Sequence, residues 1–151
     1  MEDTAPMRKL LASVLEQMGV GEIYTSDNGE DGFEKYKKHA PDIVITDWYM
    51  EPVNGIDLTK EIRTNMLSPN RMVPIILTTG YSAYERVTEA RDSGVTEFLV
   101  KPFSAGDLGK RLAYVINKPR DFVDTGNYFG PDRRRFIDKT YTGPYRRDND
   151  N

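Results

Sequence analysis

Residues 42–47 have the sequence DIVITD, in which four β-branched residues lead directly to an aspartate. Runs of this kind are typical of strands that are buried on both faces of a parallel sheet. Two further apolar runs follow at residues 73–78 and 97–100, and helical spacing of apolar residues separates the runs. Because the connections are too long for hairpins, this alternation predicts an α/β fold with a parallel sheet covered by helices on both sides.

Apolar spacing and the positions of glycine and proline outline the rest of the chain. A short strand is expected at residues 22–26. Helices are expected at residues 6–18, 31–39, from Gly55 onward, 83–93 and 104–117. Residues 118–151 lack apolar periodicity. The chain therefore divides into a domain over residues 1–117 and a largely irregular C-terminal tail over residues 118–151.

The composition excludes several classes of site. The chain has 151 residues, 38% hydrophobic and 30% charged, with a formal net charge of −3, which predicts one compact domain. Cysteine is absent and His39 is the one histidine, so disulfides and thiolate or multi-histidine metal sites are excluded, and any metal must be bound by oxygen. No apolar run approaches the roughly 20 residues of a membrane span, and no secretion leader is recognisable. We therefore expect a cytoplasmic protein without a membrane segment.

Polar residues end the three buried runs: Asp47, then Thr78 and Thr79, then Lys101. In parallel α/β sheets the carboxyl ends of the strands share one edge, where ligands bind. An acidic pair, Glu2 and Asp3, precedes the first helix. Carboxylates of this kind suit Mg²⁺, which prefers oxygen ligands. A carboxylate such as Asp47, beside a metal and an ammonium, can attack a phosphoryl group in line and become an aspartyl phosphate.

Each of these residues has an ordinary explanation when it is taken singly. Asp47 could be a turn or helix-capping residue, Thr79 a turn hydroxyl and Lys101 a solvated surface lysine. Glu2 and Asp3 could simply be an acidic terminus. Only their convergence on one edge of the predicted sheet favours a functional site.

Over about residues 1–117 the chain resembles a response-regulator receiver domain. The motifs that carry the resemblance are Glu2-Asp3, Asp47-Trp48-x-Met50 with Gly55 eight residues after the aspartate, Thr79-Gly80 and Lys101-Pro102-Phe103. The resemblance implies a flavodoxin-like, doubly wound parallel sheet with strand order 2-1-3-4-5. It also implies a cis Lys101–Pro102 peptide bond.

The resemblance also implies a role for each matching residue. Asp47 would be the phosphoacceptor, and Lys101 would be the charge partner of the phosphoryl group. The Mg²⁺ ligands would be Glu2, Asp3, Asp47 and the Tyr49 backbone carbonyl. Thr79 would sense the phosphoryl group, and Phe98 would be the aromatic switch residue.

The partners that the resemblance implies are a sensor histidine kinase or phosphotransfer protein, which donates the phosphoryl group, and a downstream protein target. The new charge on Asp47 would bias a two-state packing of the Thr79 loop and Phe98. No DNA-binding helix-turn-helix and no catalytic output domain are recognisable, so we expect output through protein contacts. Catalysis would be limited to the protein's own modification. A homodimer through about residues 83–117 is a further expectation.

The start of the chain departs from the family pattern, because Met1 directly precedes Glu2 where family members have an apolar strand. Without that central strand, its two neighbours would keep unpaired backbone groups. We hypothesise that the stated start is an internal GTG valine codon read as an initiator. A smaller departure is the pair of aromatic residues Tyr49 and Tyr81, which predicts slow self-dephosphorylation.

The tail contains a near-repeat, YFGPDRR at residues 128–134 and YTGPYRR at residues 141–147. Gly-Pro favours an extended or turned backbone before each arginine pair, so the segment can present aromatic and guanidinium groups without a core. We interpret it as a docking tail. One alternative is a solvated, largely disordered extension. Another is a segment that contacts nucleic acid through its arginines and aromatic rings, but the interleaved aspartates argue against that hypothesis.

Two other function classes remain open from the sequence. The first is a receiver-like adaptor that acts through its tail and does not need phosphorylation. The truncated start favours this hypothesis. The second is an aspartate-nucleophile phosphatase of the haloacid dehalogenase type. That class needs a second acid two residues after the nucleophile, where this chain has Tyr49.

Overall fold

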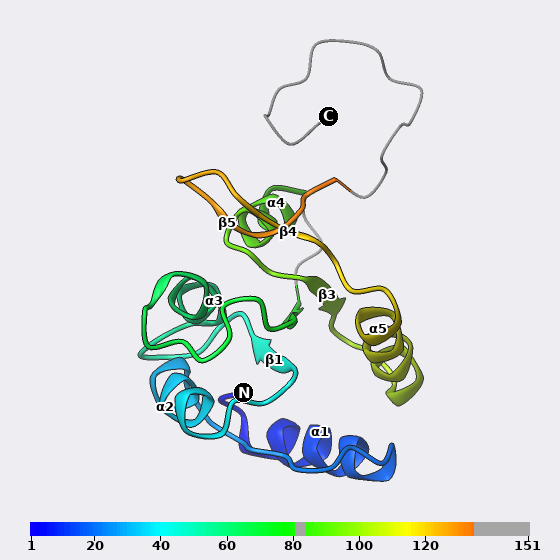
Figure 1. Ribbon diagram of the computed structural model, residues 1–151. Coiled ribbons are helices and arrows are strands. Elements are labelled where there is room, and N and C mark those ends of the chain that lie inside the picture. The colour runs from blue at the N-terminus through cyan, green and yellow to red at the C-terminus, as the bar shows by residue number, and fades with distance from the viewer. Residues whose placement is uncertain (81–83, 135–151) are drawn as a thin grey trace, which may run out of the picture.

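A three-stranded parallel sheet forms the centre of the protein, as the apolar runs predict (Figure 1). The computed structural model describes residues 1–80 and 84–134. The strands are β1 (Val44–Asp47), β2 (Ile75–Thr79) and β3 (Glu97–Val100), in the spatial order β1-β2-β3. The helices are α1 (Ala5–Gln17), α2 (Gly29–His39), α3 (Gly55–Thr64), α4 (Tyr84–Asp92) and α5 (Ala105–Asn117).

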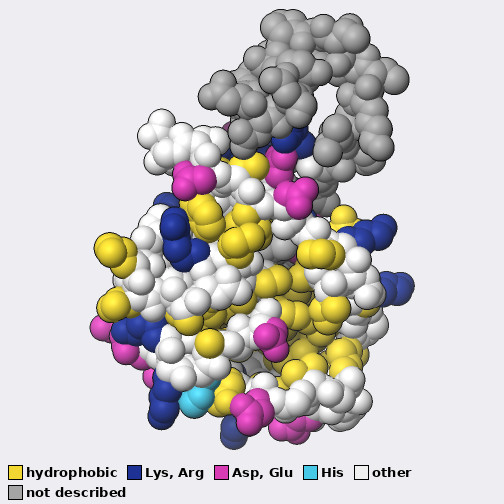
Figure 2. Space-filling model, viewed as in Figure 1, with side chains coloured by type: hydrophobic (Ala, Val, Ile, Leu, Met, Phe, Trp, Pro, Cys, Tyr) yellow, Lys and Arg dark blue, Asp and Glu magenta, His cyan; other side chains and the backbone are white. Residues whose placement is uncertain are grey.

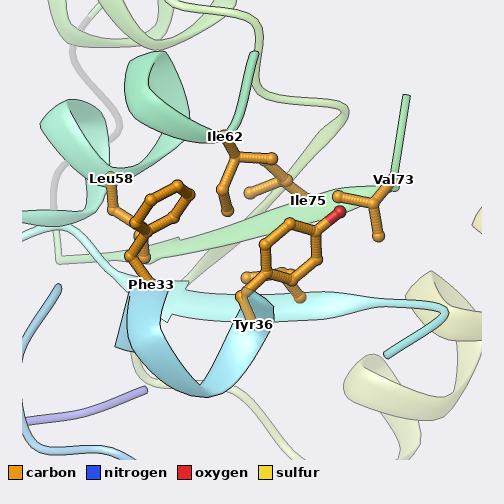
Figure 3. Close-up of a cluster of buried hydrophobic side chains, with 7 residues drawn as sticks. Phe33, Tyr36, Leu58, Ile62, Val73 and Ile75 are labelled. Carbon is orange, nitrogen blue, oxygen red and sulfur yellow. The ribbon is translucent and has the colours of Figure 1, made fainter. Parts of the chain in front are cut away.

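Helices cover both faces of this sheet, and the alternation of side chains along β2 divides the core between them. Ile76 packs with residues of α1, β3 and α5 on one face. Ile75 and Leu77 point to the opposite face, because successive residues of a strand alternate. Figure 3 shows the cluster around Ile75, in which α2 and α3 supply aromatic and aliphatic side chains. Its labelled members are Phe33, Tyr36, Leu58, Ile62, Val73 and Ile75. The doubly wound arrangement is therefore confirmed.

Polar caps fix where the helices begin. The Asn28 side chain accepts a hydrogen bond from the backbone N–H of Asp31 at 2.9 Å, so α2 begins two residues earlier than the sequence predicts. Ser104 and Asp107 form a reciprocal capping box at the start of α5. Because α5 follows β3 closely, this cap sets the helix directly beside the carboxyl end of the sheet. Among the described helices, none combines the length and apolarity that a membrane crossing requires.

The predicted strand at residues 22–26 is wrong, since this segment is extended but belongs to no sheet. A strand needs a neighbouring chain about 4.8 Å away, and most of the space between this segment and β1 is a cavity. The first residues of the chain reach this segment, since the backbone N–H of Glu2 donates to the carbonyl of Ser26 at 3.0 Å. Of the five strands in the expected order 2-1-3-4-5, the described residues thus form the last three.

Residues 118–134 are not simply an irregular tail. The short antiparallel strands β4 (Phe122–Asp124) and β5 (Phe129–Pro131) form a hairpin that contains most of the first Gly-Pro repeat. The hairpin lies against α3 and α4 (Figure 1): β5 contacts α3, and Arg133 pairs with Asp92 of α4 at 2.8 Å. The second copy of the repeat, at residues 141–147, lies outside the described residues.

A buried cation, Arg63, joins this hairpin to the rest of the fold. Its guanidinium donates to the carbonyls of Gly94, Arg71 and Val73 at 3.0, 2.8 and 2.7 Å, and lies 5.0 Å from the centroid of the Phe122 ring. Burial lowers the pKa of Arg63 to about 10. The planar guanidinium presents five N–H donors spread over three nitrogens, so it reaches carbonyls that lie farther apart than the three donors of one ammonium can reach.

We predict that Arg63→Lys lowers the free energy of unfolding by about 2–4 kcal/mol, because buried carbonyls lose their donors. The measurement is urea unfolding at neutral pH. Arg91→Lys is the matched control, since Arg91 is half exposed and pairs with its neighbour Asp92, and it should change stability by less than about 0.5 kcal/mol. Equal stability of Arg63→Lys and the unsubstituted protein would contradict the structural role given to this guanidinium.

Candidate functional site

Three carboxylates meet at the carboxyl end of β1. Glu2 and Asp47 are buried and Asp3 is exposed, and one carboxylate oxygen of each lies within 4.8 Å of the others. The backbone holds the acidic pair beside the strand, because the N–H of Asp47 donates to the carbonyl of Met1 at 3.0 Å. The sequence prediction that these three residues converge is therefore confirmed by their positions.

Lys101 bridges the two buried carboxylates. Its Nζ lies 2.9 Å from Glu2 Oε2 and 3.0 Å from Asp47 Oδ1. Its backbone N–H donates to the carbonyl of Thr79 at 2.7 Å, which fixes the end of β3 against the end of β2, and the bond to Pro102 is cis, as predicted. Burial alone would lower the pKa of Lys101, but the hydrogen bonds and charges of Glu2 and Asp47 outweigh burial and raise it. Lys101 is thus a fixed positive charge beside Asp47.

β2 ends in two threonines, Thr78 and Thr79, which make different contacts in the site. Thr78 pairs with Asp47 in the sheet register, and its hydroxyl lies 3.3 Å from Asp47 Oδ1. Sequence reasoning did not assign Thr78 to the site, because the register that sets it opposite Asp47 cannot be read from the two runs separately. Thr79 is buried at the last position of β2, where its carbonyl holds Lys101.

The loop after Asp47 folds back under the aspartate. Gly55 donates its N–H to the carbonyl of Trp48 at 2.9 Å, and a Cβ on Gly55 would lie 2.2 Å from the backbone oxygen of Asp47. Only glycine fits this approach. The loop also carries Tyr49, whose side chain is 47% exposed and stacks on the Trp48 ring with 6.3 Å between centroids.

The side chain expected to act as a switch, Phe98, packs against a buried cluster next to the site. The cluster comprises Trp48, Ile56, Leu77, Ala90 and Val95. Phe98 itself is partly buried, and Trp48 also carries the Arg86 guanidinium 5.6 Å from its ring centroid. This buried cluster therefore connects Trp48, the residue after Asp47, with Phe98 of β3 and Ala90 of α4.

The arrangement suits a hard cation and a phosphoryl group. Its ligand atoms are carboxylate oxygens, which Mg²⁺ prefers, and the exposed position of Asp3 leaves room for the waters that Mg²⁺ keeps. Lys101 supplies a positive charge on the other side of Asp47. A metal and an ammonium around one carboxylate are the groups that phosphoryl transfer needs most.

The comparisons with known proteins agree with this geometry. The family model of the response regulator receiver domain matches residues 1–113, so the chain belongs to that family. The chain is 30% identical over 118 residues to chemotaxis protein CheY-3 of Vibrio cholerae, covering 78% of this chain and 89% of the relative. It is 34% identical over 122 residues to the transcriptional regulatory protein PdtaR of Mycobacterium tuberculosis, covering 81% of this chain and 57% of the relative.

Solved structures show the same fold. The chemotaxis protein CheY4 of Vibrio cholerae superposes with a TM-score of 0.69 at 28% identity, over 76% of this chain and 92% of that chain. The receiver domain of the sensor histidine kinase PA1611 of Pseudomonas aeruginosa, which was solved with a magnesium ion in its active-site cleft, gives a TM-score of 0.69 at 22% identity, over 78% of this chain and 94% of that chain. Receiver domains are generally phosphoacceptors without enzymatic activity on other substrates, and they bind Mg²⁺ at an acidic cluster.

We predict that Gly55→Ala destabilises the protein by more than about 2 kcal/mol, since the added Cβ must displace the backbone that carries Asp47. The measurement is urea unfolding. Gly109→Ala in α5 is the matched control, because its Cβ would meet Met18 at an ordinary 3.5 Å and alanine favours a helix, so stability should stay equal or rise. An equal, small effect of both changes would contradict the close approach at Gly55.

We also predict that Lys101→Met lowers the free energy of unfolding at pH 7 by about 2–3 kcal/mol, because Glu2 and Asp47 then face each other without a cation. Urea unfolding at pH 7 measures this loss, with the exposed Lys9→Met as control, which should leave stability nearly unchanged. An equally small effect of Lys101→Met would contradict the role given to this cation.

Proposed function

We propose that Asp47 accepts a phosphoryl group and that this modification switches the protein's contacts with a partner. The observation that carries the proposal is the position of Lys101, which lies within 3.0 Å of Asp47 and 2.9 Å of Glu2 at the edge where the three strands end. Membership of the receiver family supports phosphorelay signalling as the process.

The reaction is a transfer between a phosphorylated imidazole and Asp47. One carboxylate oxygen of Asp47 attacks phosphorus, the new O–P bond forms as the N–P bond of the donor breaks, and the electron pair of that bond stays on the imidazole nitrogen. Glu2, Asp3, Asp47 and the backbone carbonyl of Tyr49 would hold Mg²⁺, which neutralises charge on the phosphoryl oxygens when it is bound. Lys101 exchanges its carboxylate contacts for contacts with the phosphoryl group and so holds the new charge.

The switch starts from the two hydroxyls at the end of β2. In this proposal Thr79 turns toward the phosphoryl group, while Thr78 keeps the Asp47 carboxylate aligned through its 3.3 Å contact. Movement of the β2 end changes the packing of Phe98 and of the cluster around Trp48. A local charge is thereby converted into a changed surface on β3 and α4.

The family implies a histidine kinase or a phosphotransfer protein as the phosphoryl donor. The described residues contain no DNA-binding unit, so the proposed output is a contact with a downstream protein. The homodimer through about residues 83–117, the cytoplasmic location and the slow loss of phosphate expected from Tyr49 stay predictions. Tyr81 lies outside the described residues.

We predict that acetyl phosphate with Mg²⁺ adds one phosphoryl group to the folded protein, as measured by intact-protein mass. Asp47→Ala should abolish the addition, and removal of Mg²⁺ with a chelator should reduce it strongly. Asp42→Ala is the matched control, since Asp42 is an exposed acid at the other end of the same run and should leave labelling unchanged. Labelling that persists in Asp47→Ala would overturn the assignment, and a folded protein that is never labelled would favour the phosphorylation-independent adaptor.

A further inference from the structure

The C-terminal hairpin lies beside α4 (Figure 1) and holds the turn that joins α4 to β3. We call this segment, residues 92–96, the α4–β3 turn. After β5, Arg133 donates to the Asp92 carboxylate at 2.8 Å. Before β4, Arg120 donates to the backbone carbonyl of Thr96 at 3.2 Å. The hairpin and its flanking arginines therefore contact both ends of the α4–β3 turn, on the upper part of the molecule in Figure 2.

The middle of the α4–β3 turn packs directly on the backbone of the hairpin. Gly94 has a φ of +99°, a conformation that favours glycine, and its carbonyl accepts from Arg63 Nε at 3.0 Å. On the hairpin, Gly130 of β5 is buried, and a Cβ added there would lie 3.1 Å from Gly94 Cα and would overlap the Tyr128 hydroxyl. Because no room is left between the two backbones, the turn cannot shift while this contact stays intact.

Stacked rings anchor the other side of the hairpin on α3 and on the loop after α3. The Arg63 guanidinium lies 5.0 Å from the centroid of the Phe122 ring, and the Arg71 guanidinium lies 4.0 Å from the centroid of the Phe129 ring. The two rings lie against each other with 5.7 Å between their centroids. Contacts between guanidinium groups and aromatic faces are attractive. The hairpin is therefore fixed on α3 where it meets the α4–β3 turn.

The α4–β3 turn is also part of the packing around the site. Val95 lies in the turn, is 2% exposed and belongs to the same buried cluster as Trp48, the residue after Asp47. Ala90 of α4 is a further member of this cluster. Packed side chains therefore connect the residue after Asp47 with the turn that the hairpin holds.

We propose that the hairpin regulates the response to phosphorylation by stabilising the arrangement of the α4–β3 turn that belongs to unmodified Asp47. The inference rests on the proposed function, in which a phosphoryl group on Asp47 repacks the cluster around Trp48 and Phe98. Since Val95 is a member of that cluster, the repacking shifts the turn and separates Gly94 from the hairpin. The hairpin thus opposes the switch, and phosphorylation loosens the hairpin.

Thermodynamic linkage makes this coupling reciprocal. If a phosphoryl group on Asp47 weakens the contact between hairpin and turn, a substitution that weakens this contact must favour the modified state by the same factor. Beryllium trifluoride, a reversibly bound analogue of the phosphoryl group, makes the coupling measurable as a binding constant. Trp48 is the one tryptophan of the chain and lies next to the site, so its fluorescence serves to follow binding.

The test titrates beryllium trifluoride into the full chain at saturating Mg²⁺ and follows the fluorescence of Trp48. Gly130→Ala, whose Cβ pushes the hairpin away from Gly94, should lower the Kd of the analogue by at least about 3-fold. Arg133→Gln is a milder second variant, which removes the ion pair with Asp92 and should lower the Kd by about 2-fold. In the unsubstituted protein, saturation with the analogue should speed amide hydrogen exchange in β4 and β5 by at least about 3-fold.

Gly126→Asn and Arg134→Gln are the matched controls and should leave the Kd unchanged. Gly126 has a φ of +79°, which asparagine tolerates, and an added Cβ meets nothing within 4 Å. Arg134 pairs with Asp132 of its own segment. Equal Kd values in all variants, with unchanged exchange in the hairpin, would overturn the regulatory role and leave the function of Asp47 intact. If the analogue causes no change in fluorescence or exchange that depends on Asp47, both proposals fall.

Discussion

The ammonium of Lys101 between the carboxylates of Glu2 and Asp47 is the interaction on which the site depends. Two buried carboxylates this close repel each other strongly in a medium less polar than water, and one cation between them turns the repulsion into attraction. The three residues come from the start of the chain, from the end of β1 and from the residue after β3. One charge cluster therefore joins three distant parts of the sequence at the edge where the chemistry is proposed.

The same cluster explains why a phosphoryl group would act as a switch. In the structure the Lys101 ammonium pairs with the carboxylates of Glu2 and Asp47, and the Thr78 hydroxyl lies 3.3 Å from Asp47 Oδ1. A phosphoryl group on Asp47 brings new oxygens that compete for Lys101, and the ends of β2 and β3 are tied to each other through the Lys101 backbone. In the proposed switch, a rearrangement at Asp47 would therefore reach the ends of both β2 and β3.

The sheet and most of the site could be predicted from the sequence because buried parallel strands leave a plain signal. The apolar runs that end at Asp47 and Lys101 fix both the strands and the edge at which they meet. Thr78 could not be assigned, because its contact with Asp47 depends on the register between strands. Residues 22–26 have the composition of a strand, yet a strand exists only with a neighbour, and most of the space between this segment and β1 is a cavity. The hairpin of residues 122–131 depends on Arg63, whose burial no local pattern indicates.

The most direct measurement is a crystal structure of the protein with Mg²⁺ and beryllium trifluoride, an analogue of the phosphoryl group. We predict the analogue bonded to an oxygen of Asp47, a fluorine within hydrogen-bonding distance of Lys101 Nζ, and the metal held by Glu2, Asp3, Asp47 and the backbone carbonyl of Tyr49. An analogue bound elsewhere, with Lys101 still bridging Glu2 and Asp47, would contradict it.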